Sequence, residues 1–203
     1  EAKRAYGEEA ITAFIRLNGQ TVGGIATNGG NLHWKDIAKM NRFIRFCNTY
    51  SLPILTICDT TGFENCLCNE KHLAKETAEL LSAYGNASVP MVTVVKKAVG
   101  SAGACLGSKG IGADLVFAYP ESEISVMEPS LAANILYPEG SLEEREAKTK
   151  MYLDEKASAQ SAASRGYIDA LIFPEETRQR VISALDMLYG KADFDFHKKF
   201  GSI

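Results

Sequence analysis

A β-branched apolar run that passes directly into small residues, VVKKAVGSAGACLGSKG at 94–110, constrains the fold of this chain more than any other stretch. It predicts a buried strand followed by a short helix from about Ser101 to Ser108. A helix start presents N–H groups that have no intrahelical partner and the positive end of a dipole, so an anionic oxygen can bind there if side chains leave room. The glycines would equally let the helix pack closely on the sheet, and composition alone leaves both interpretations open.

The first half of the chain alternates strands and helices, which predicts an α/β fold. Two β-rich runs flank Asn18-Gly19, a dipeptide that suits a tight hairpin turn. Apolar residues recur at helical spacing in 36–50 and again in 71–85. Apolar strands are predicted at 53–59 and 90–99, so a strand and helix unit is repeated.

The second half predicts further strands and a helical tail. Segments 113–120 and 122–127 read as two strands separated by a Pro-Glu-Ser turn, and a short helix follows them. The charged segment 141–166 is predicted to be helical, with Gly166 as its stop. A final strand is expected within 166–174. No linker or low-complexity stretch interrupts the chain, so residues 1–203 are expected to form a single domain.

Composition narrows the classes of function. The chain is 46% hydrophobic and carries a net charge of −3 with acidic and basic residues mixed, so it has no broad basic face for nucleic acid. No apolar run approaches the ~20 residues of a membrane helix, and the charged start EAKRAYGEEA is unlike a signal peptide. We therefore expect a soluble cytoplasmic protein with no nucleic-acid partner and no direct membrane insertion.

The five cysteines predict reduced thiols rather than a disulfide framework. Cys47, Cys58 and Cys105 lie within apolar segments, where a free thiol behaves as a small core residue. Cys66 and Cys68 form a lone CLC pair without a second pair of ligands in the sequence. We interpret it as an incidental loop pair and expect no metal site.

The segment from Pro90 to Ser130 resembles the central part of the crotonase superfamily, in which backbone amides of a small-residue turn form an oxyanion hole. Within that superfamily, four runs that together cover nearly the whole chain resemble the carboxyltransferase subunits of biotin-dependent acyl-CoA carboxylases and decarboxylases, in their carboxyl-terminal, biotin-side half. The resemblance implies a crotonase/ClpP-like spiral of ββα units. The four runs are RLNGQTVGGIATNGG, FIRFCNTYSLPILTICDTTGF, SVPMVTVVKKAVGSAGA and ASRGYIDALIFPEETRQRV.

Carried over residue by residue, the resemblance places the catalytic groups at Gly100, Ser101 and Ala102. Transfer of a carboxyl group from carboxybiotin to an acyl-CoA leaves negative charge on the ureido oxygen. The N–H groups of Ser101 and Ala102 are expected to stabilise this charge, and one oxyanion-hole donor is typically worth about 3 kcal/mol. Backbone donors do not depend on side chains, so this chemistry needs no side-chain acid or base.

The resemblance also implies a cofactor-binding loop. Thr61, Gly62 and Phe63 match the family loop beside the biotin pocket, in a turn that follows a buried strand. Asp59 begins this turn, and we expect its carboxylate to cap the turn rather than to catalyse. Biotin itself would arrive as carboxybiotin on a carrier protein.

The implied partners are an acyl-CoA substrate, a biotin carrier protein and the amino-terminal carboxyltransferase half that would carry most of the acyl-CoA site. Because family active sites lie between halves from different subunits, a homo- or hetero-oligomer is expected.

The chain departs from the family pattern at several positions, and the acidic replacements among them favour an alternative, a non-catalytic structural or regulatory subunit. Gly103 stands where the family has tyrosine, and Ser101 replaces the second of two glycines. The loop ENCLCNEK at 64–71 replaces a glycine-proline loop. Glu76 and Glu79 stand where the family is basic.

Two other enzyme classes share the fold. An enoyl-CoA hydratase needs paired carboxylates, and Glu128 is the only carboxylate that the sequence places near the turn. A ClpP-like protease with Ser101 as nucleophile needs a histidine base, but His33, His72 and His197 lie away from the family position.

Overall fold

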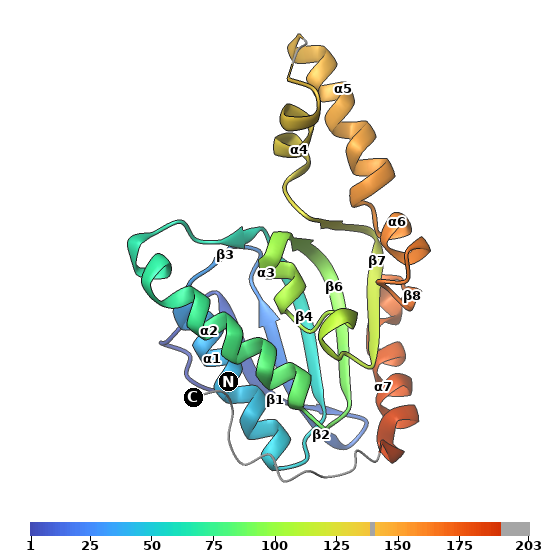
Figure 1. Cartoon of the computed structure of the whole chain (residues 1–203). Helices are drawn as coiled ribbons and strands as arrows, with labels where there is room; N and C mark the ends of the chain where they lie inside the picture. Colours follow the sequence, from blue (N-terminus) through green and yellow to red (C-terminus); the bar gives the residue numbers. More distant parts are fainter. Residues whose placement is uncertain (139–140, 192–203) are drawn as a thin grey trace.

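A six-stranded sheet forms the centre of the protein in a computed structural model that describes residues 1–138 and 141–191 (Figure 1). Its strand order is β1-β2-β4-β6-β7-β8; β1 and β2 are antiparallel and every later neighbouring pair is parallel. The α/β prediction is therefore confirmed. The strands are β1 (Ala10–Leu17), β2 (Gln20–Thr27), β4 (Ile54–Thr60), β6 (Met91–Val99), β7 (Leu115–Ser125) and β8 (Ala170–Leu171).

The predicted hairpin joins β1 to β2. Leu17 pairs with Gln20 across a two-residue loop, and both loop residues, Asn18 and Gly19, have positive φ angles of 49° and 80°. Asparagine and glycine are the residues that tolerate this conformation best, which is why the dipeptide fixes the turn.

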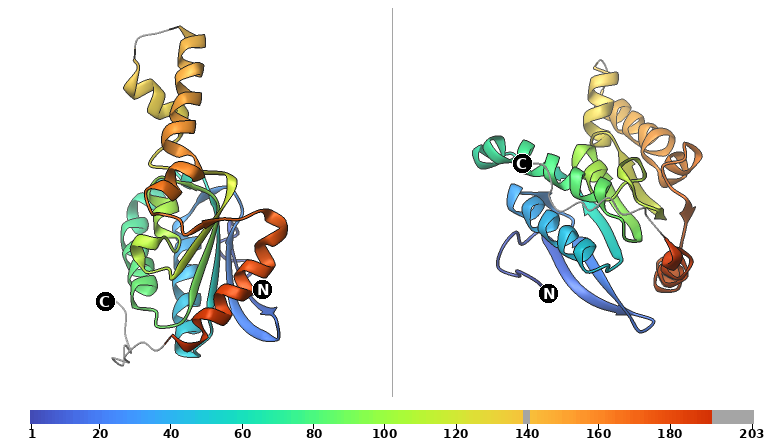
Figure 2. Two further views of the ribbon diagram at one scale, coloured as in Figure 1. Left: turned by 90° about the vertical axis from the view of Figure 1, so that its right-hand side faces the viewer. Right: turned by 60° about the horizontal axis from the view of Figure 1, so that its bottom comes forward.

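Helices cover both faces of the sheet (Figure 2). The helices α1 (Trp34–Thr49), α2 (Leu67–Asn86) and α3 (Gly100–Cys105) lie over one face, and α7 (Thr177–Met187) lies over the other. Each face has its own buried core. The first contains Ile37, Met40, Ile44, Leu80 and Tyr84, and the second contains Val22, Val92, Val94, Val181 and Leu185.

The prediction of two strands around Pro120 is wrong, because β7 is continuous. Val95 of β6 pairs with Ala118, whereas Lys97 pairs with Glu123, so the extra residues of β7 are accommodated as a shift of register. The Ser122 hydroxyl donates a 2.7 Å hydrogen bond to the carbonyl of Val95 inside this irregularity. The Pro-Glu-Ser turn signal thus marks a bulge within a strand.

The charged segment is helical but interrupted. It contains α5 (Leu142–Tyr152), a π-helical turn (Leu153–Ala157) and α6 (Ala159–Ser164), with extended backbone at Ser158. Gly166 follows α6 with a φ of +79°, so the predicted stop is confirmed. The final strand, β8, is present but has only two residues. In the part of the chain that the structure describes, short 3₁₀ turns also occur at Lys109–Ile111, Pro174–Glu176 and Leu188–Gly190.

An arm made of α4 (Pro129–Leu136) and α5 projects from the sheet beyond the end of β7 (Figure 1). It carries exposed apolar side chains at Leu131, Ile135, Leu136 and Met151. None of the described helices is both long enough and apolar enough to cross a membrane.

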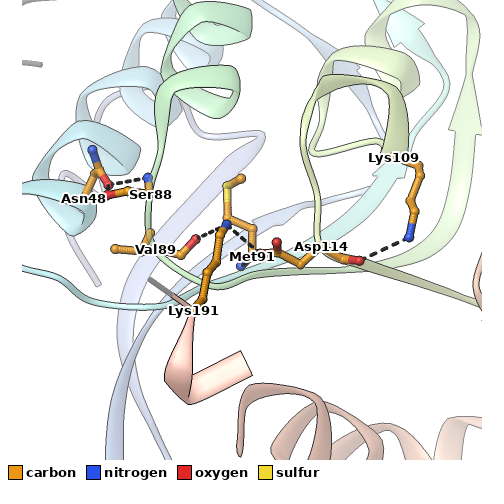
Figure 3. Close-up of polar contacts among 7 residues, drawn as sticks. All are labelled: Asn48, Ser88, Val89, Met91, Lys109, Asp114 and Lys191. Atoms are coloured by element: carbon orange, nitrogen blue, oxygen red, sulfur yellow. Dashed lines mark hydrogen bonds and ion pairs between the residues drawn. The ribbon is translucent and has the colours of Figure 1, made fainter. Parts of the chain in front are cut away.

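Polar side chains close the amino-terminal end of β6 (Figure 3). A carboxylate oxygen of Asp114 accepts hydrogen bonds from the Met91 N–H at 2.8 Å and from the Lys191 ammonium at 3.0 Å. Lys191 also donates to the Val89 carbonyl at 3.2 Å, and Lys109 donates to the Asp114 carbonyl at 3.1 Å. Segments far apart in the sequence therefore satisfy the backbone here.

Candidate active site

The junction of β6 and α3 changes direction within one residue. Val99 has extended backbone angles, and Gly100 has a φ of +65° that L side chains rarely adopt. A Cβ at Gly100 would lie 3.4 Å from the carbonyl oxygen of Val126. The glycine is thus required by backbone conformation, and it lets the strand enter the helix without an intervening loop.

The N–H groups of Ser101 and Ala102 lie in the first turn of α3. Within residues 1–138 and 141–191, neither N–H group donates a hydrogen bond to a backbone or side-chain oxygen. Ser101 is exposed and lines a cavity, whereas Ala102 is buried. Two adjacent donors are therefore left over at this junction.

Gly103 has a different reason to be glycine. A Cβ at this position would lie 2.7 Å from backbone atoms of Ala98, a distance that no real side chain tolerates. The helix thus packs directly on the strand that precedes it. Close packing of helix on strand explains Gly103, whereas the N–H group of Ser101 stays unpaired within the described residues. Close packing and available N–H donors, the two interpretations of the small residues, thus apply to different positions.

A cavity of about 530 Å³ lies between α2, α3 and the segment that follows β4. Phe63 of β5 (Gly62–Phe63) and Ser101 of α3 both line it. One face of α2 forms its longest wall, with Leu73, Ala74, Thr77, Ala78 and Leu81. The cavity thus brings together two predicted site residues that are far apart in the sequence.

The other residues of the predicted cofactor loop do not line the cavity. The Thr61 hydroxyl donates to the Asn31 side chain at 2.8 Å, and Gly62 has a φ of +148°. The strand β5 pairs in parallel with β3 (Asn31–Leu32) in a separate two-stranded sheet. Thr61 and Gly62 therefore support the loop from which Phe63 reaches the cavity.

The expectation that Asp59 caps the turn is wrong. Its carboxylate forms an ion pair with Lys96 of β6 at 2.6 Å, and this hydrogen bond and the carboxylate charge raise the pKa of Lys96. The turn is held by Thr60, whose hydroxyl donates to the Gly30 carbonyl at 3.0 Å and lies 3.3 Å from the Gly62 N–H. A buried threonine thus takes the role expected of the aspartate.

The acidic replacements on α2 lie away from the cavity wall. Neither Glu76 nor Glu79 lines the cavity, although Thr77 and Ala78 between them do. Glu79 accepts a 2.9 Å hydrogen bond from Asn41 of α1, so it joins the two helices. Glu79 therefore acts on the packing of α1 and α2 rather than on the cavity surface.

Sequence reasoning missed the polar residues of the loop between β5 and α2. Glu64, Cys66, Asn69 and Glu70 all line the cavity. His33 approaches this loop from the start of α1, and one donor atom each of His33, Glu64 and Cys66 lies within 4.8 Å of the other two. The signal was the loop's departure from the family pattern, but the sequence does not show that His33 is nearby.

Asn69 organises this loop from inside. It is 3% exposed, and its amide donates to the Glu64 carbonyl at 2.7 Å and to the Leu32 carbonyl at 3.2 Å. Its side-chain oxygen accepts from the Trp34 N–H at 2.8 Å. One buried amide therefore joins the loop, β3 and α1.

The cavity contains carboxylates, as an enoyl-CoA hydratase would need, but no histidine, as a ClpP-like protease would need, among the described residues. Glu128 is exposed and does not line the cavity, so it supplies no carboxylate there; Glu64 and Glu70 do line it. His33 and His72 do not line the cavity beside Ser101, and His197 lies outside the described residues. The described part of the chain thus offers Ser101 no histidine base.

Comparisons with known proteins agree with this geometry. A family model described as carboxyl transferase domain matches residues 1–203. The chain is 40% identical to methylmalonyl-CoA decarboxylase subunit alpha of Veillonella parvula, covering 100% of this chain and 41% of the relative. It is 37% identical to a putative propionyl-CoA carboxylase beta chain of Bacillus subtilis (strain 168), covering 100% of this chain and 42% of the relative.

Solved structures show the same likeness in three dimensions. Transcarboxylase 12S, crystallised as a hexamer with hydrolysed methylmalonyl-coenzyme A bound, superposes with a TM-score of 0.93 at 32% identity and covers 98% of this chain and 41% of its own. The beta subunit of P. aeruginosa geranyl-CoA carboxylase gives a TM-score of 0.84 at 25% identity, covering 99% and 41%. The expected crotonase-like fold is thus confirmed, and the chain spans about two fifths of the length of these proteins.

Proposed function

Because this chain belongs to the carboxyl transferase domain family, we propose that it moves a carboxyl group between carboxybiotin and an acyl-CoA, as the biotin-side half of a carboxyltransferase. The single observation that carries the proposal is the pair of N–H groups at Ser101 and Ala102, which have no partner among residues 1–138 and 141–191, where Ser101 lines the same cavity as Phe63. The preserved backbone turn favours a catalytic role over a purely structural one, because its donors are independent of the side chains that differ from the family.

The cavity has the character that a biotin ring needs. Phe63, Leu73 and Leu81 provide apolar surface, and Ser101 lines the same space of about 530 Å³. Apolar walls with a few convergent polar groups are the usual composition of a small-molecule site. Phe63 and the N–H groups of Ser101 and Ala102 would hold the ring, and Gly62 and Thr61 would position Phe63.

The chain's own contribution to catalysis is electrostatic. When bound, carboxybiotin would supply the carboxyl group, and its ureido group would also supply the base for the α-proton of the acyl-CoA. The N–H groups of Ser101 and Ala102, at a helix start, would stabilise negative charge on the ureido oxygen without reorganising. The chain itself would then need no side-chain acid or base.

The chain is proposed to act with partners. Its length, about two fifths of its relatives, supports a requirement for an amino-terminal half that carries most of the acyl-CoA site. The exposed apolar side chains of the α4–α5 arm support a homo- or hetero-oligomer, because apolar surface of this kind is normally covered. A biotin carrier protein would deliver the cofactor.

Reconstitution tests the proposal. The chain is mixed with and without an amino-terminal half from a relative, together with carboxylated biotin carrier, and transfer of labelled carboxyl to propionyl-CoA is measured. The reverse reaction, loss of the carboxyl group from methylmalonyl-CoA, is measured in parallel. We expect negligible transfer by the chain alone and recovery of transfer with the added half.

Other outcomes point to the other candidates. Stable association with the added half but no transfer in any combination would support a non-catalytic subunit. Hydration of an enoyl-CoA by the chain would support the hydratase class instead, with Glu64 and Glu70 as the carboxylates that line the cavity.

A further inference from the structure

We propose that His33, Glu64 and Cys66 bind a zinc ion at the rim of the cavity. The three residues come from different segments: His33 precedes α1, Glu64 follows β5, and Cys66 precedes α2. One donor atom from each lies within 4.8 Å of the other two. This site is independent of the proposed function.

The geometry allows an ion after small side-chain movements. Zinc takes nitrogen, sulfur and carboxylate ligands in tetrahedral geometry at about 2.0–2.3 Å, so the three donors have to close in on one another. Glu64 is exposed and its side chain can rotate, whereas His33 and Cys66 are half-buried.

The donor groups are nearly uncommitted. Within the described residues, the side chains of Glu64 and Cys66 take part in no hydrogen bond or ion pair, and His33 accepts one long bond, from the Lys35 N–H to Nδ1 at 3.4 Å. Binding through either imidazole nitrogen removes this bond, because the other nitrogen must then carry the proton. The loss is small, since Asp36 holds the helix start by accepting the His33 N–H at 2.9 Å.

The backbone under the ligands is fixed by buried groups. Asn69 holds the Glu64 carbonyl at 2.7 Å and the Trp34 N–H at 2.8 Å, so the segments that bear Glu64 and His33 are joined by one side chain. A preorganised backbone lowers the entropy lost when the ion binds. Supporting contacts of this kind are typical of metal sites.

The ligand types favour zinc as the metal, and the buried thiols of the chain are poorer ligands than Cys66. A thiolate with an imidazole favours zinc over magnesium or calcium, and binding releases the Cys66 proton to solvent. Burial raises the pKa of Cys47 to about 11 and, with the charge of Asp59 adding to it, that of Cys58 to about 12. Those thiols stay protonated, and Cys105 is likewise buried with a raised pKa.

The ion would border the same cavity as Ser101, because Glu64 and Cys66 line it. Three protein ligands leave a fourth position for water or another ligand. The inferred role is to fix the loop that replaces the glycine-proline loop of the family, at one end of the cavity.

Metal titration of the full chain tests the site. The reduced protein is titrated with Co²⁺ and then with Zn²⁺. We expect one cobalt per chain, a thiolate-to-cobalt charge-transfer band in the near ultraviolet, and displacement by Zn²⁺. Cys66→Ser should abolish the band, while His33→Asn and Glu64→Gln weaken affinity by at least about tenfold, as even loss of a supporting contact costs about 10- to 100-fold.

The chain offers a matched control for the thiol and one for the imidazole. Cys68→Ser removes an exposed thiol outside the cluster, and His72→Asn removes an imidazole outside the cluster that, like His33, packs against Trp34. Both should keep the metal. Cys66→Ser and His33→Asn should fold, because serine and asparagine are preferred at the helix starts that Cys66 and His33 occupy.

Alkylation gives a second readout. Zn²⁺ should slow labelling of Cys66 by iodoacetamide, measured by mass spectrometry, and should leave Cys68 labelling unchanged. The proposal is overturned if cobalt gives no charge-transfer band, if Cys68→Ser removes the band while Cys66→Ser keeps it, or if Zn²⁺ protects both cysteines equally.

Discussion

The two ends of β6 treat their backbone polar groups in opposite ways. At the amino-terminal end, side chains of Asp114 and Lys191 take up the Met91 N–H and the Val89 carbonyl (Figure 3). At the carboxyl-terminal end, the N–H groups of Ser101 and Ala102 have no partner in the described residues.

The amino-terminal end of β6 thus contributes to stability, whereas the carboxyl-terminal end keeps donors available for a ligand. An unsatisfied buried polar group costs about 1–3 kcal/mol, so closing the first end contributes to folding. Donors left open at the second end cost stability unless a ligand or water takes them up. Changes at the two ends should therefore affect different measurements.

The largest effect, a loss of activity, is expected from Ser101→Pro. Proline has no N–H group, so one unpaired donor is removed, and proline is tolerated in the first turn of a helix. Loss of one oxyanion-hole donor should lower carboxyl transfer by the reconstituted protein by about 10²- to 10³-fold. The initial rate of labelled carboxyl transfer measures this, and thermal unfolding should show a much smaller change.

The matched variant is Ser101→Ala, which keeps the N–H and removes only the hydroxyl. Its transfer rate should stay within a few-fold of the original. A large loss of transfer activity in this variant would mean that the Ser101 hydroxyl, rather than its backbone N–H, is needed for the reaction.

Next in size is Asp114→Ala at the closed end. It leaves the Met91 N–H and the Lys191 ammonium without their acceptor and should lower the free energy of unfolding by about 1–3 kcal/mol. Urea denaturation measures the loss. Asp114→Asn retains an oxygen acceptor and should lose less; equal losses would show that charge, and not acceptance of the Met91 N–H, closes this end.

A loss of similar size is expected from Gly103→Ala beside the open end. The new Cβ would meet Ala98 at 2.7 Å, and overpacking of this kind costs about 1–3 kcal/mol, partly relieved by shifts of the helix. Gly190→Ala is the control, because its Cβ meets nothing within 4 Å. If both variants have the same melting temperature, the close contact of α3 with β6 is not as described.

The smallest effect concerns the ion pair of Lys96 with Asp59. Lys96→Met should cost less than about 1 kcal/mol, as is usual for exposed ion pairs. Because the folded-state pKa of Lys96 is raised, the pair contributes fully below the ordinary lysine value of 10.5 and its contribution is lost as the pH rises through the raised pKa. The stability difference between the two proteins, measured by denaturation, should therefore shrink at high pH; a constant difference would assign it to packing.

Local signals predicted most of the fold. The Asn18-Gly19 turn, the apolar strands and the helical spacing of α1 and α2 all depend on residues close in sequence, so they can be recognised without the tertiary structure. The Pro-Glu-Ser signal failed because β7 absorbs it as a bulge against β6. That outcome depends on pairing between strands, which the local sequence does not contain.

The candidate site divides along the same line. Small residues at the β6–α3 junction indicated open backbone donors, since the property lies in the main chain itself. The positions of Asp59 and His33 depend on which segments meet in space, Lys96 in one case and the loop after β5 in the other. Contacts between side chains of distant segments therefore stayed hidden, whereas the strand-to-helix junction could be predicted from neighbouring residues.

The contact between Gly103 and Ala98 also limits how the junction of β6 and α3 can vary. A position that admits no Cβ cannot accept a larger residue unless the helix moves away from the strand. Thr77, Ala78 and Leu81 of α2 line the cavity with side chains instead. Selection for a different cavity shape should accordingly leave Gly103 untouched and change α2.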